Sequence, residues 1–218
     1  MKPSTMMIQF ENEKYAMVVA NGDQLSFNLL KKMAQKSDFL LAADGGANHL
    51  FQMKIRPHAI LGDLDSLHIN FFQGDVKVIP RLSQEVNDLE KSILFLRSSG
   101  YQNILLTGVH GQRDDHFFAA LQLVKKYLRK VRISILTDYS EIFALGPGNH
   151  RIFADKDKLF SVFGFPRGYE IRTENLKYPL KGENLFESSR GISNVSLANQ
   201  VTIQISKGCL LIFRNTVR

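Results

Sequence analysis

Apolar positions in the first 140 residues alternate between short continuous runs and a helical spacing. The continuous runs predict buried strands at 15–20, 39–43, 59–61, 76–79, 104–106 and 131–136. Between them, apolar side chains recur every three or four residues, which predicts helices over 25–33, 47–53, 87–98 and 117–128. Strands that alternate with helices in this way predict an α/β domain built on a mostly parallel sheet.

The pattern changes after Phe143, and Gly146-Pro147-Gly148 marks the break. From His150 onward the chain has no helical stripe, only short apolar runs separated by turn residues. The runs lie at 158–163, 169–172, 176–180, 201–205 and 210–213. We therefore expect an α/β domain over residues 1–143, followed by a small all-β domain of the sandwich type over 149–218.

Composition narrows the class of protein. The chain has 218 residues, of which 44% are hydrophobic and 22% charged, which is ordinary globular usage and excludes a disordered or collagen-like chain. A single cysteine, Cys209, excludes an intramolecular disulfide and a cysteine-rich zinc site. No apolar run approaches the ~20 residues that span a bilayer, and the first ten residues lack a signal-peptide core, so we expect a cytoplasmic protein without a membrane partner.

The net charge of +7 favours an acidic partner, such as nucleic acid, anionic lipid or a phosphorylated small molecule. The densest basic run, Lys125 to Arg132, closes a predicted helix, where cations complement the helix dipole. This run is therefore weak evidence for nucleic-acid binding.

Polar and glycine-rich loops follow the predicted strands of the first domain, at the sheet edge where α/β proteins bind ligands. In Asp44-Gly45-Gly46-Ala47-Asn48, two glycines allow backbone N–H groups to approach an anion at a helix N-terminus. The same residues also fit a plain tight turn with Asp44 as a cap.

The next loop, Gly62-Asp63-Leu64-Asp65-Ser66, carries two carboxylates on one side of an extended segment, about 7 Å apart. Such a pair suits Mg²⁺ held by carboxylates and substrate phosphates. A solvated loop with a capping residue is the alternative. The same spacing occurs in nucleotide-sugar glycosyltransferases, so it indicates the metal and not the reaction.

Two further segments open helices. In Gln84 to Lys91, Asn87 or Asp88 can cap the helix, or Asp88 can add a third carboxylate with Lys91 as a phosphate partner. In the segment from Thr107 to His116, Arg113 can bind a phosphate and Asp115 can orient a hydroxyl or a metal ligand, unless they only begin the helix.

Walker A, HExxH and GxSxG motifs are absent from the sequence. Acidic loops, anion-binding turns and one arginine at one sheet edge favour phosphoryl-type transfer from a nucleotide.

The order of these motifs resembles the thiamine pyrophosphokinase family. ADGGAN at 43–48, GDLDS at 62–66, NDLEK at 87–91 and GxxGxRxDH at 108–116 occur in the family's order. LKYPL at 176–180 and SRGISN at 189–194 are similar to its thiamine-binding segments. Gln112 departs from the pattern, because the family's last loop has a second glycine there.

The resemblance implies an α/β catalytic domain and a β-sandwich, in a homodimer with active sites at the subunit interface. The implied reaction transfers the pyrophosphoryl group of ATP to the hydroxyl of thiamine and releases AMP. Mg²⁺ would be held by Asp63, Asp65 and Asp88, and thiamine would face Tyr178, Ser193 and Asn194. Residues implied at the ATP and phosphate site are Asp44, Gly45, Gly46, Asn48, Gln84, Asn87, Lys91, Gly108, Gly111, Arg113, Asp115 and His116.

Three other functions stay open at this stage. A pyrophosphokinase for another alcohol, such as a hydroxymethyl pterin, would share the acidic loops but not Ser193-Asn194. A glycosyltransferase would use nucleotide sugars and ignore ATP. A non-catalytic basic module would bind RNA with an affinity that falls steeply with salt.

Overall fold

A computed structural model of the chain describes residues 8–10, 12–62, 76–79, 85–186 and 188–215. The chain forms two compact units. The first comprises Phe10–Leu123 and Lys130–Thr137, and the second comprises Asp138–Arg218 with Met1–Gln9 and Val124–Arg129. Each unit is considered by itself.

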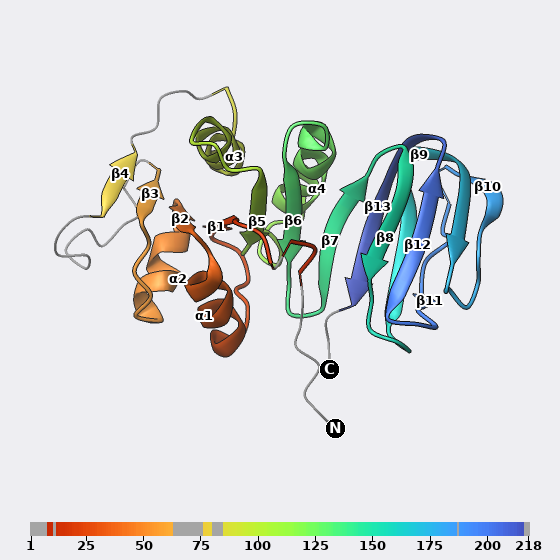
Figure 1. Ribbon diagram of the computed structural model, residues 1–218. Coiled ribbons are helices and arrows are strands. Elements are labelled where there is room, and N and C mark those ends of the chain that lie inside the picture. The colour runs from red at the N-terminus through yellow and green to blue at the C-terminus, as the bar shows by residue number, and fades with distance from the viewer. Residues whose placement is uncertain (1–7, 11, 63–75, 80–84, 187, 216–218) are drawn as a thin grey trace. The chain divides into compact units, whose positions relative to one another are not determined.

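The first unit is built on a parallel sheet whose strands follow the order β4-β3-β2-β1-β5-β6 (Figure 1). The strands are β1 (Ala16–Val19), β2 (Phe39–Ala43), β3 (Ala59–Leu61), β4 (Lys77–Ile79), β5 (Asn103–Thr107) and β6 (Arg132–Leu136). The helices are α1 (Phe27–Lys36), α2 (Gly46–Gln52), α3 (Asp88–Ser98) and α4 (Asp114–Tyr127). The predicted α/β architecture is confirmed, with element ends within a few residues of those predicted.

The strand order reverses between β1 and β5. From β1 the chain steps outward to β2, β3 and β4, and after α3 it returns to the other side of β1 as β5. The connections that follow β1 and β5 therefore lead to opposite sides of the sheet, and this is the point where open α/β sheets bind a ligand. Every residue of β1 and β5 is buried, which explains why both strands appear in the sequence as unbroken apolar runs.

The second unit is an antiparallel β structure, as predicted. Its strands follow the order β7-β13-β9-β12-β8, and β10 and β11 also pair with β9. The strands are β7 (Ser140–Leu145), β8 (Gly148–Phe153), β9 (Leu159–Glu174), β10 (Lys181–Leu185), β11 (Asn194–Val195), β12 (Gln200–Ile205) and β13 (Lys207–Asn215). Apolar side chains from β7, β8, β9, β10, β12 and β13 share one core.

Strand β9 differs from the prediction of two separate runs. Gly164 and Gly168 indicate a turn in the sequence, but both lie within the continuous strand. A Cβ at Gly164 would stand 2.0 Å from the Leu185 carbonyl oxygen, and one at Gly168 would stand 2.5 Å from a Leu210 methyl. These glycines therefore serve close strand packing and not a change of direction.

The predicted run at 176–180 is also not a strand. Leu176 forms an isolated bridge with Ser196, and the next residues lie outside regular structure. Strands β7, β8 and β10 were not predicted. Strands β8 and β10 carry few apolar residues, which explains why these two were missed. None of the helices in the described residues has the length and apolar character that crossing a bilayer requires.

Candidate active site

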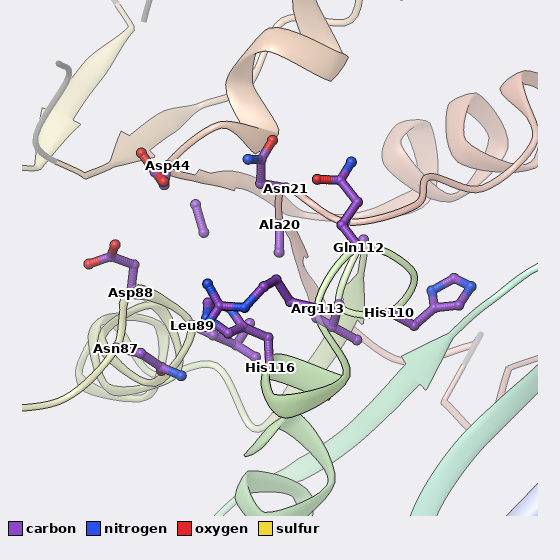
Figure 2. A pocket seen from close by; sticks show the side chains of 14 residues that line it. Ala20, Asn21, Asp44, Asn87, Asp88, Leu89, His110, Gln112, Arg113 and His116 are labelled. Atoms are coloured by element: carbon purple, nitrogen blue, oxygen red, sulfur yellow. The ribbon is translucent and has the colours of Figure 1, made fainter. Parts of the chain in front are cut away.

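A pocket of about 430 Å³ lies at the carboxyl ends of the central strands of the first unit (Figure 2). It is formed by the loops after β1, β2 and β5 and by the first turn of α3. Its lining residues are Ala20, Asn21, Gly22, Ala43, Asp44, Asn87, Asp88, Leu89, Gly108, Val109, His110, Gln112, Arg113 and His116. The pocket thus occupies the position where the strand order reverses.

The loop after β2 places Asp44 in the pocket. Asp44 has a positive φ of 46°, and its backbone N–H donates to the Leu61 carbonyl oxygen over 2.8 Å. The two glycines that follow allow α2 to approach β1, because a Cβ at Gly46 would stand 2.0 Å from the Val19 carbonyl oxygen. Asp44 lines the pocket, whereas Gly45, Gly46 and Asn48 of the same motif do not.

The start of α3 supplies a second carboxylate. Asn87 caps the helix, with its Oδ1 accepting from the Glu90 N–H at 2.9 Å. Asp88 lines the pocket with a side chain 20% exposed, and its Oδ1 accepts from the Lys91 Nζ at 3.2 Å. The Lys91 side chain is only 11% exposed and does not line the pocket. Lys91 therefore compensates the Asp88 charge from one turn further along the helix.

The loop after β5 contributes the cation. The Arg113 Nε and Nη2 donate to the two carboxylate oxygens of Asp115 at 2.8 and 2.6 Å, and both side chains are about two-thirds exposed. The Arg113 guanidinium lowers the pKa of the Asp115 carboxyl to about 2. Arg113 lines the pocket and Asp115 does not. The geometry makes Asp115 a partner of Arg113 and a weak base near neutral pH.

Figure 2 shows how the charged groups are distributed. The carboxylates of Asp44 and Asp88 lie on one side of the pocket, and the Arg113 guanidinium extends toward that side. Asn21 and Gln112 present amide groups elsewhere on the wall. Two carboxylates that face an arginine could accommodate an anion together with a cation.

The metal prediction is only partly covered by the structure. Asp63, Asp65 and Gln84 lie outside the described residues, so their positions are not compared with the pocket. Within the described ranges, no group of three or more acidic, histidine or cysteine side chains forms a metal-binding cluster. Asp88 and Asp44 supply hard oxygen donors there, and Mg²⁺ commonly takes only one or two carboxylates together with substrate phosphates. The donor set therefore fits Mg²⁺ bound with a nucleotide.

Tyr178, Ser193 and Asn194 lie in the second unit. Tyr178 is 62% exposed, and the Lys177 ammonium stands 5.5 Å from its ring centre. Asn194 is 2% exposed: its Oδ1 accepts from the Tyr178 and Val195 N–H groups, both at 2.9 Å, and its Nδ2 donates to the Tyr178 carbonyl oxygen at 2.7 Å. The Asn194 amide thus binds both polar groups of the Tyr178 backbone.

Ser193, by contrast, is exposed and presents its hydroxyl on the surface. Its backbone has a positive φ of 54°, and its N–H donates to the Ser161 Oγ at 3.0 Å. Of the three predicted thiamine residues, Tyr178 and Ser193 are accessible, whereas Asn194 is buried and bonded to the Tyr178 backbone.

Several pocket residues were not predicted from the sequence. Asn21, Gly22 and His110 line the pocket, although the pair Asn21-Gly22 indicates in the sequence only a turn after the first strand. Their place in the sequence could have identified them, because this turn leaves a strand at the same carboxyl edge as the acidic loops. Gln112, the departure from the family pattern, also lines the pocket.

Comparisons with known proteins identify the family. The model of the "Thiamin pyrophosphokinase, catalytic domain" matches residues 30–137, and that of the "Thiamin pyrophosphokinase, vitamin B1 binding domain" matches residues 149–210. The chain belongs to the thiamin pyrophosphokinase family. The two matches follow the order in which the α/β and the β-rich parts occur along the chain.

Individual relatives of the thiamin pyrophosphokinase family agree over nearly the whole chain. The thiamine pyrophosphokinase of Bacillus subtilis is 25% identical over 208 residues, covering 91% of this chain and 97% of the relative. Thiamin pyrophosphokinase 1 of Caenorhabditis elegans is 24% identical over 206 residues, covering 87% and 85%. These alignments include both units.

Solved structures share the fold. The crystal structure of the Bacillus subtilis thiamine pyrophosphokinase matches with a TM-score of 0.82 at 23% identity, covering 93% of this chain and 99% of that one. The yeast thiamin pyrophosphokinase structure matches with a TM-score of 0.80 at 17% identity, covering 94% and 87%. At these identities the structural similarity establishes the fold alone.

Proposed function

We propose that this protein transfers the pyrophosphoryl group of ATP to the hydroxyl of thiamine, and that ATP binds in the pocket at the carboxyl ends of β1, β2 and β5. The observation that best supports this proposal is the position of the pocket. It lies at the reversal of strand order, and its lining residues from Ala43 to His116 all belong to the segment that the catalytic-domain model matches. The chain is thus a thiamine diphosphokinase with ATP as co-substrate.

The reaction requires little covalent chemistry from the protein. The thiamine hydroxyl oxygen forms a bond to the β-phosphorus of ATP, the bond from that phosphorus to the oxygen bridging to the α-phosphorus breaks, and AMP leaves. The hydroxyl proton is released to a base or to water. Catalysis of this kind rests on positioning the two reactants and compensating phosphate charge.

We assign Asp63, Asp65 and Asp88 as the residues that hold Mg²⁺ with the ATP phosphates. Asp88 supports the assignment from within the described residues, because its carboxylate lines the pocket on the same side as Asp44. When bound, Mg²⁺ would neutralise charge on the phosphate oxygens. Lys91 holds the Asp88 carboxylate in place over 3.2 Å.

Arg113 binds a phosphate oxygen of ATP in the proposed site, and Asp115 holds the guanidinium in position. A carboxyl whose pKa is about 2 attracts a proton poorly at neutral pH, so Asp115 is a weak candidate for the proton acceptor. The Asp88 carboxylate, which lines the pocket, is the alternative proton acceptor.

The other predicted site residues fall into two groups, those that line the pocket and the rest. Asp44, Asn87, Gly108 and His116 line the pocket and are proposed to contact ATP directly. The remaining predicted residues shape the loops or lie outside the described part of the chain: Gly45, Gly46, Asn48, Gln84 and Gly111.

On the thiamine side, Tyr178 offers an exposed aromatic face and Ser193 an exposed hydroxyl. Both lie in the segment matched by the vitamin B1 binding model. An aromatic ring stacks on planar cationic heterocycles such as those of thiamine. We propose that Asn194 acts through Tyr178, whose backbone it holds, and not by touching thiamine.

We further propose that the enzyme works in the cytoplasm as a homodimer with its active sites at the subunit interface. The exposed apolar side chains Leu159, Ile192 and Leu197 of the second unit support an association surface.

An AMP-release assay with ATP and Mg²⁺, with and without thiamine, tests the function. We expect AMP formation that depends on thiamine and matches thiamine diphosphate mole for mole. AMP release with a hydroxymethyl pterin but not with thiamine would keep the nucleotide site and reject the substrate. Absence of ATP turnover with every alcohol tested would reject the function itself.

A further inference from the structure

Gln24 lies behind one wall of the pocket and takes no part in lining it. The wall is the loop from Ala20 to Gly22, which continues β1 beyond its end. Three backbone hydrogen bonds join this segment to the loop after β5: Ala20 N–H to Thr107 O at 2.9 Å, Gly22 N–H to Gly108 O at 2.6 Å and Asp23 N–H to His110 O at 2.8 Å. Two of the pocket walls are therefore one connected backbone structure.

The Gln24 side chain ties the remaining polar groups of this wall together. Its Nε2 donates to the carbonyl oxygens of Ala20 and Gly22, both at 2.7 Å. Both neighbours are acceptors, so the amino end of the amide must face them. The Gln24 Oε1 is buried and has no hydrogen-bond partner among the described residues. The two bonds that Nε2 donates are therefore the hydrogen bonds that the Gln24 side chain makes within the described residues.

The glycine that follows β5 makes room for this arrangement. Gly108 has a positive φ of 68°, and a Cβ there would stand 2.4 Å from both the Gln24 Nε2 and the Ala20 carbonyl oxygen. The Gln24 amide is thus packed directly against the backbone of the β5 loop. It cannot move without moving a residue that lines the pocket.

The bonds from Gln24 also orient a backbone donor. In a trans peptide the C=O and the following N–H point in opposite directions. The Ala20 carbonyl points at Gln24, so the Asn21 N–H points away from it, and no described group accepts from this N–H. Asn21 lines the pocket, whose proposed ligand carries anionic oxygens.

From these contacts we propose that Gln24 is a positioning residue for the nucleotide: it fixes the Ala20-Asn21-Gly22 wall so that the Asn21 N–H donates to an anionic oxygen of ATP. This inference rests on the proposed function for the identity of the ligand. It extends that function to a residue that touches neither substrate.

The test compares Gln24→Met with Gln35→Met. Gln24→Met keeps the length of the side chain and removes the amide, and Gln35 is an exposed residue of α1 that serves as the matched control. Equilibrium binding of Mg·ATP is measured by calorimetry, together with kcat, both KM values and Tm, well below the melting temperature of each variant. We expect the Kd for ATP to rise about tenfold in Gln24→Met, as for loss of one net hydrogen bond, while the thiamine KM stays unchanged.

Other results would overturn the inference. Wild-type ATP affinity in folded Gln24→Met would remove any positioning role. Equal losses in ATP affinity, thiamine KM and kcat that follow a lowered Tm would reduce Gln24 to a structural residue. If Gln24→Met does not fold, Gln24→Asn keeps the amide but shortens its reach, and the same selective loss of ATP affinity is expected. Failure of the wild-type protein to bind Mg·ATP would instead reject the nucleotide pocket, and with it the proposed function.

Discussion

Arg113 and Asp115 stand two residues apart at the start of α4, and their ion pair determines what each can do. The sequence suggested two separate roles, a phosphate ligand and a carboxylate that orients a hydroxyl. In the structure, the Nε and Nη2 groups of Arg113 both donate to the carboxylate of Asp115. Spacing alone could not reveal this pairing, because it depends on the side-chain conformations of the loop.

The pH dependence of Asp115 follows from this pair. A carboxyl with a lowered pKa is ionised above that pKa and loses its pairing only as the pH falls through it, here near pH 2. The pair is therefore intact across the whole range from pH 5 to 9 in which activity is measured. We expect Asp115→Asn to lower kcat at every pH in this range without moving the acidic limb of the pH–rate profile.

The measurement is the pH–rate profile of the wild-type and variant enzymes, with Asp114→Asn as the neighbouring control. Because Arg113 and Asp115 are exposed, Tm should change little. An acidic limb that disappears in Asp115→Asn would show that Asp115 titrates as the base, contrary to the role proposed for it.

Asn194 allows a second prediction at the scale of one side chain. Asn194→Ala removes the three hydrogen bonds that hold the Tyr178 backbone and Val195. We expect the thiamine KM to rise about tenfold, as for the loss of one or two net hydrogen bonds. The ATP KM should stay the same, because Asn194 does not line the proposed nucleotide pocket. Steady-state kinetics with each substrate varied in turn measures both.

Asn199→Ala is the control, because Asn199 is exposed and its side-chain Oδ1 accepts a long bond of 3.3 Å from the Lys156 N–H. If Asn194 acts through Tyr178, the double variant with Tyr178→Ala should be no worse for thiamine than Tyr178→Ala alone. Additive losses would mean that Asn194 contacts thiamine itself.

At the scale of elements, the loops that leave β1 and β5 lie so close together that only glycine fits at position 108, where they meet. Gly108→Ala places a Cβ 2.4 Å from the Ala20 carbonyl oxygen and forces a non-glycine residue to a φ of 68°. We expect a loss of unfolding free energy of about 2–4 kcal/mol, from backbone strain and steric overlap together, with weakened ATP binding.

Gly100→Ala separates the two causes. Gly100 has a similar positive φ of 92°, but nothing lies within 4 Å of the position of its Cβ. Its replacement should cost about 1 kcal/mol, for conformation alone. Urea denaturation of both variants gives the difference, and equal losses would contradict the close packing between Gln24 and Gly108.

The burial of a strand helps to explain whether the sequence could predict it. Parallel strands buried on both faces leave apolar runs, so β1, β2, β3, β5 and β6 were found with nearly correct ends. The edge strands β8 and β10 were missed, because exposed strands carry polar residues. Glycines that allow close packing, such as Gly164 in β9, resemble turn glycines until the neighbouring strand is known.

The candidate site was predictable to the same degree. Carboxylates and glycines after strands identified the loops around Asp44, Asp88 and Arg113, since strand ends converge on one edge of the sheet. Asn21 was missed because its turn carries no charge. The bonds from Asn194 to the Tyr178 backbone span 16 residues, and no local pattern encodes them.

At the scale of the whole molecule, the proposed homodimer makes a prediction about how residues combine. Asp88, a residue of the proposed ATP site, lies in the first unit, and Tyr178 lies in the second. If each active site takes Asp88 from one subunit and Tyr178 from the other, a heterodimer of Asp88→Asn with Tyr178→Ala has one site with both changes and one with neither. If each site belongs to one subunit, every site in that heterodimer carries one change.

Mixing the two variants distinguishes these arrangements. After dissociation and random reassociation, half of the dimers are heterodimers, so a shared site predicts recovery of about one-quarter of wild-type activity. The assay is thiamine-dependent AMP release after co-refolding, with each variant refolded alone as the control and light scattering to establish the mass. Activity that stays at the level of the separate variants, in a preparation shown to be dimeric, would place each active site within one chain.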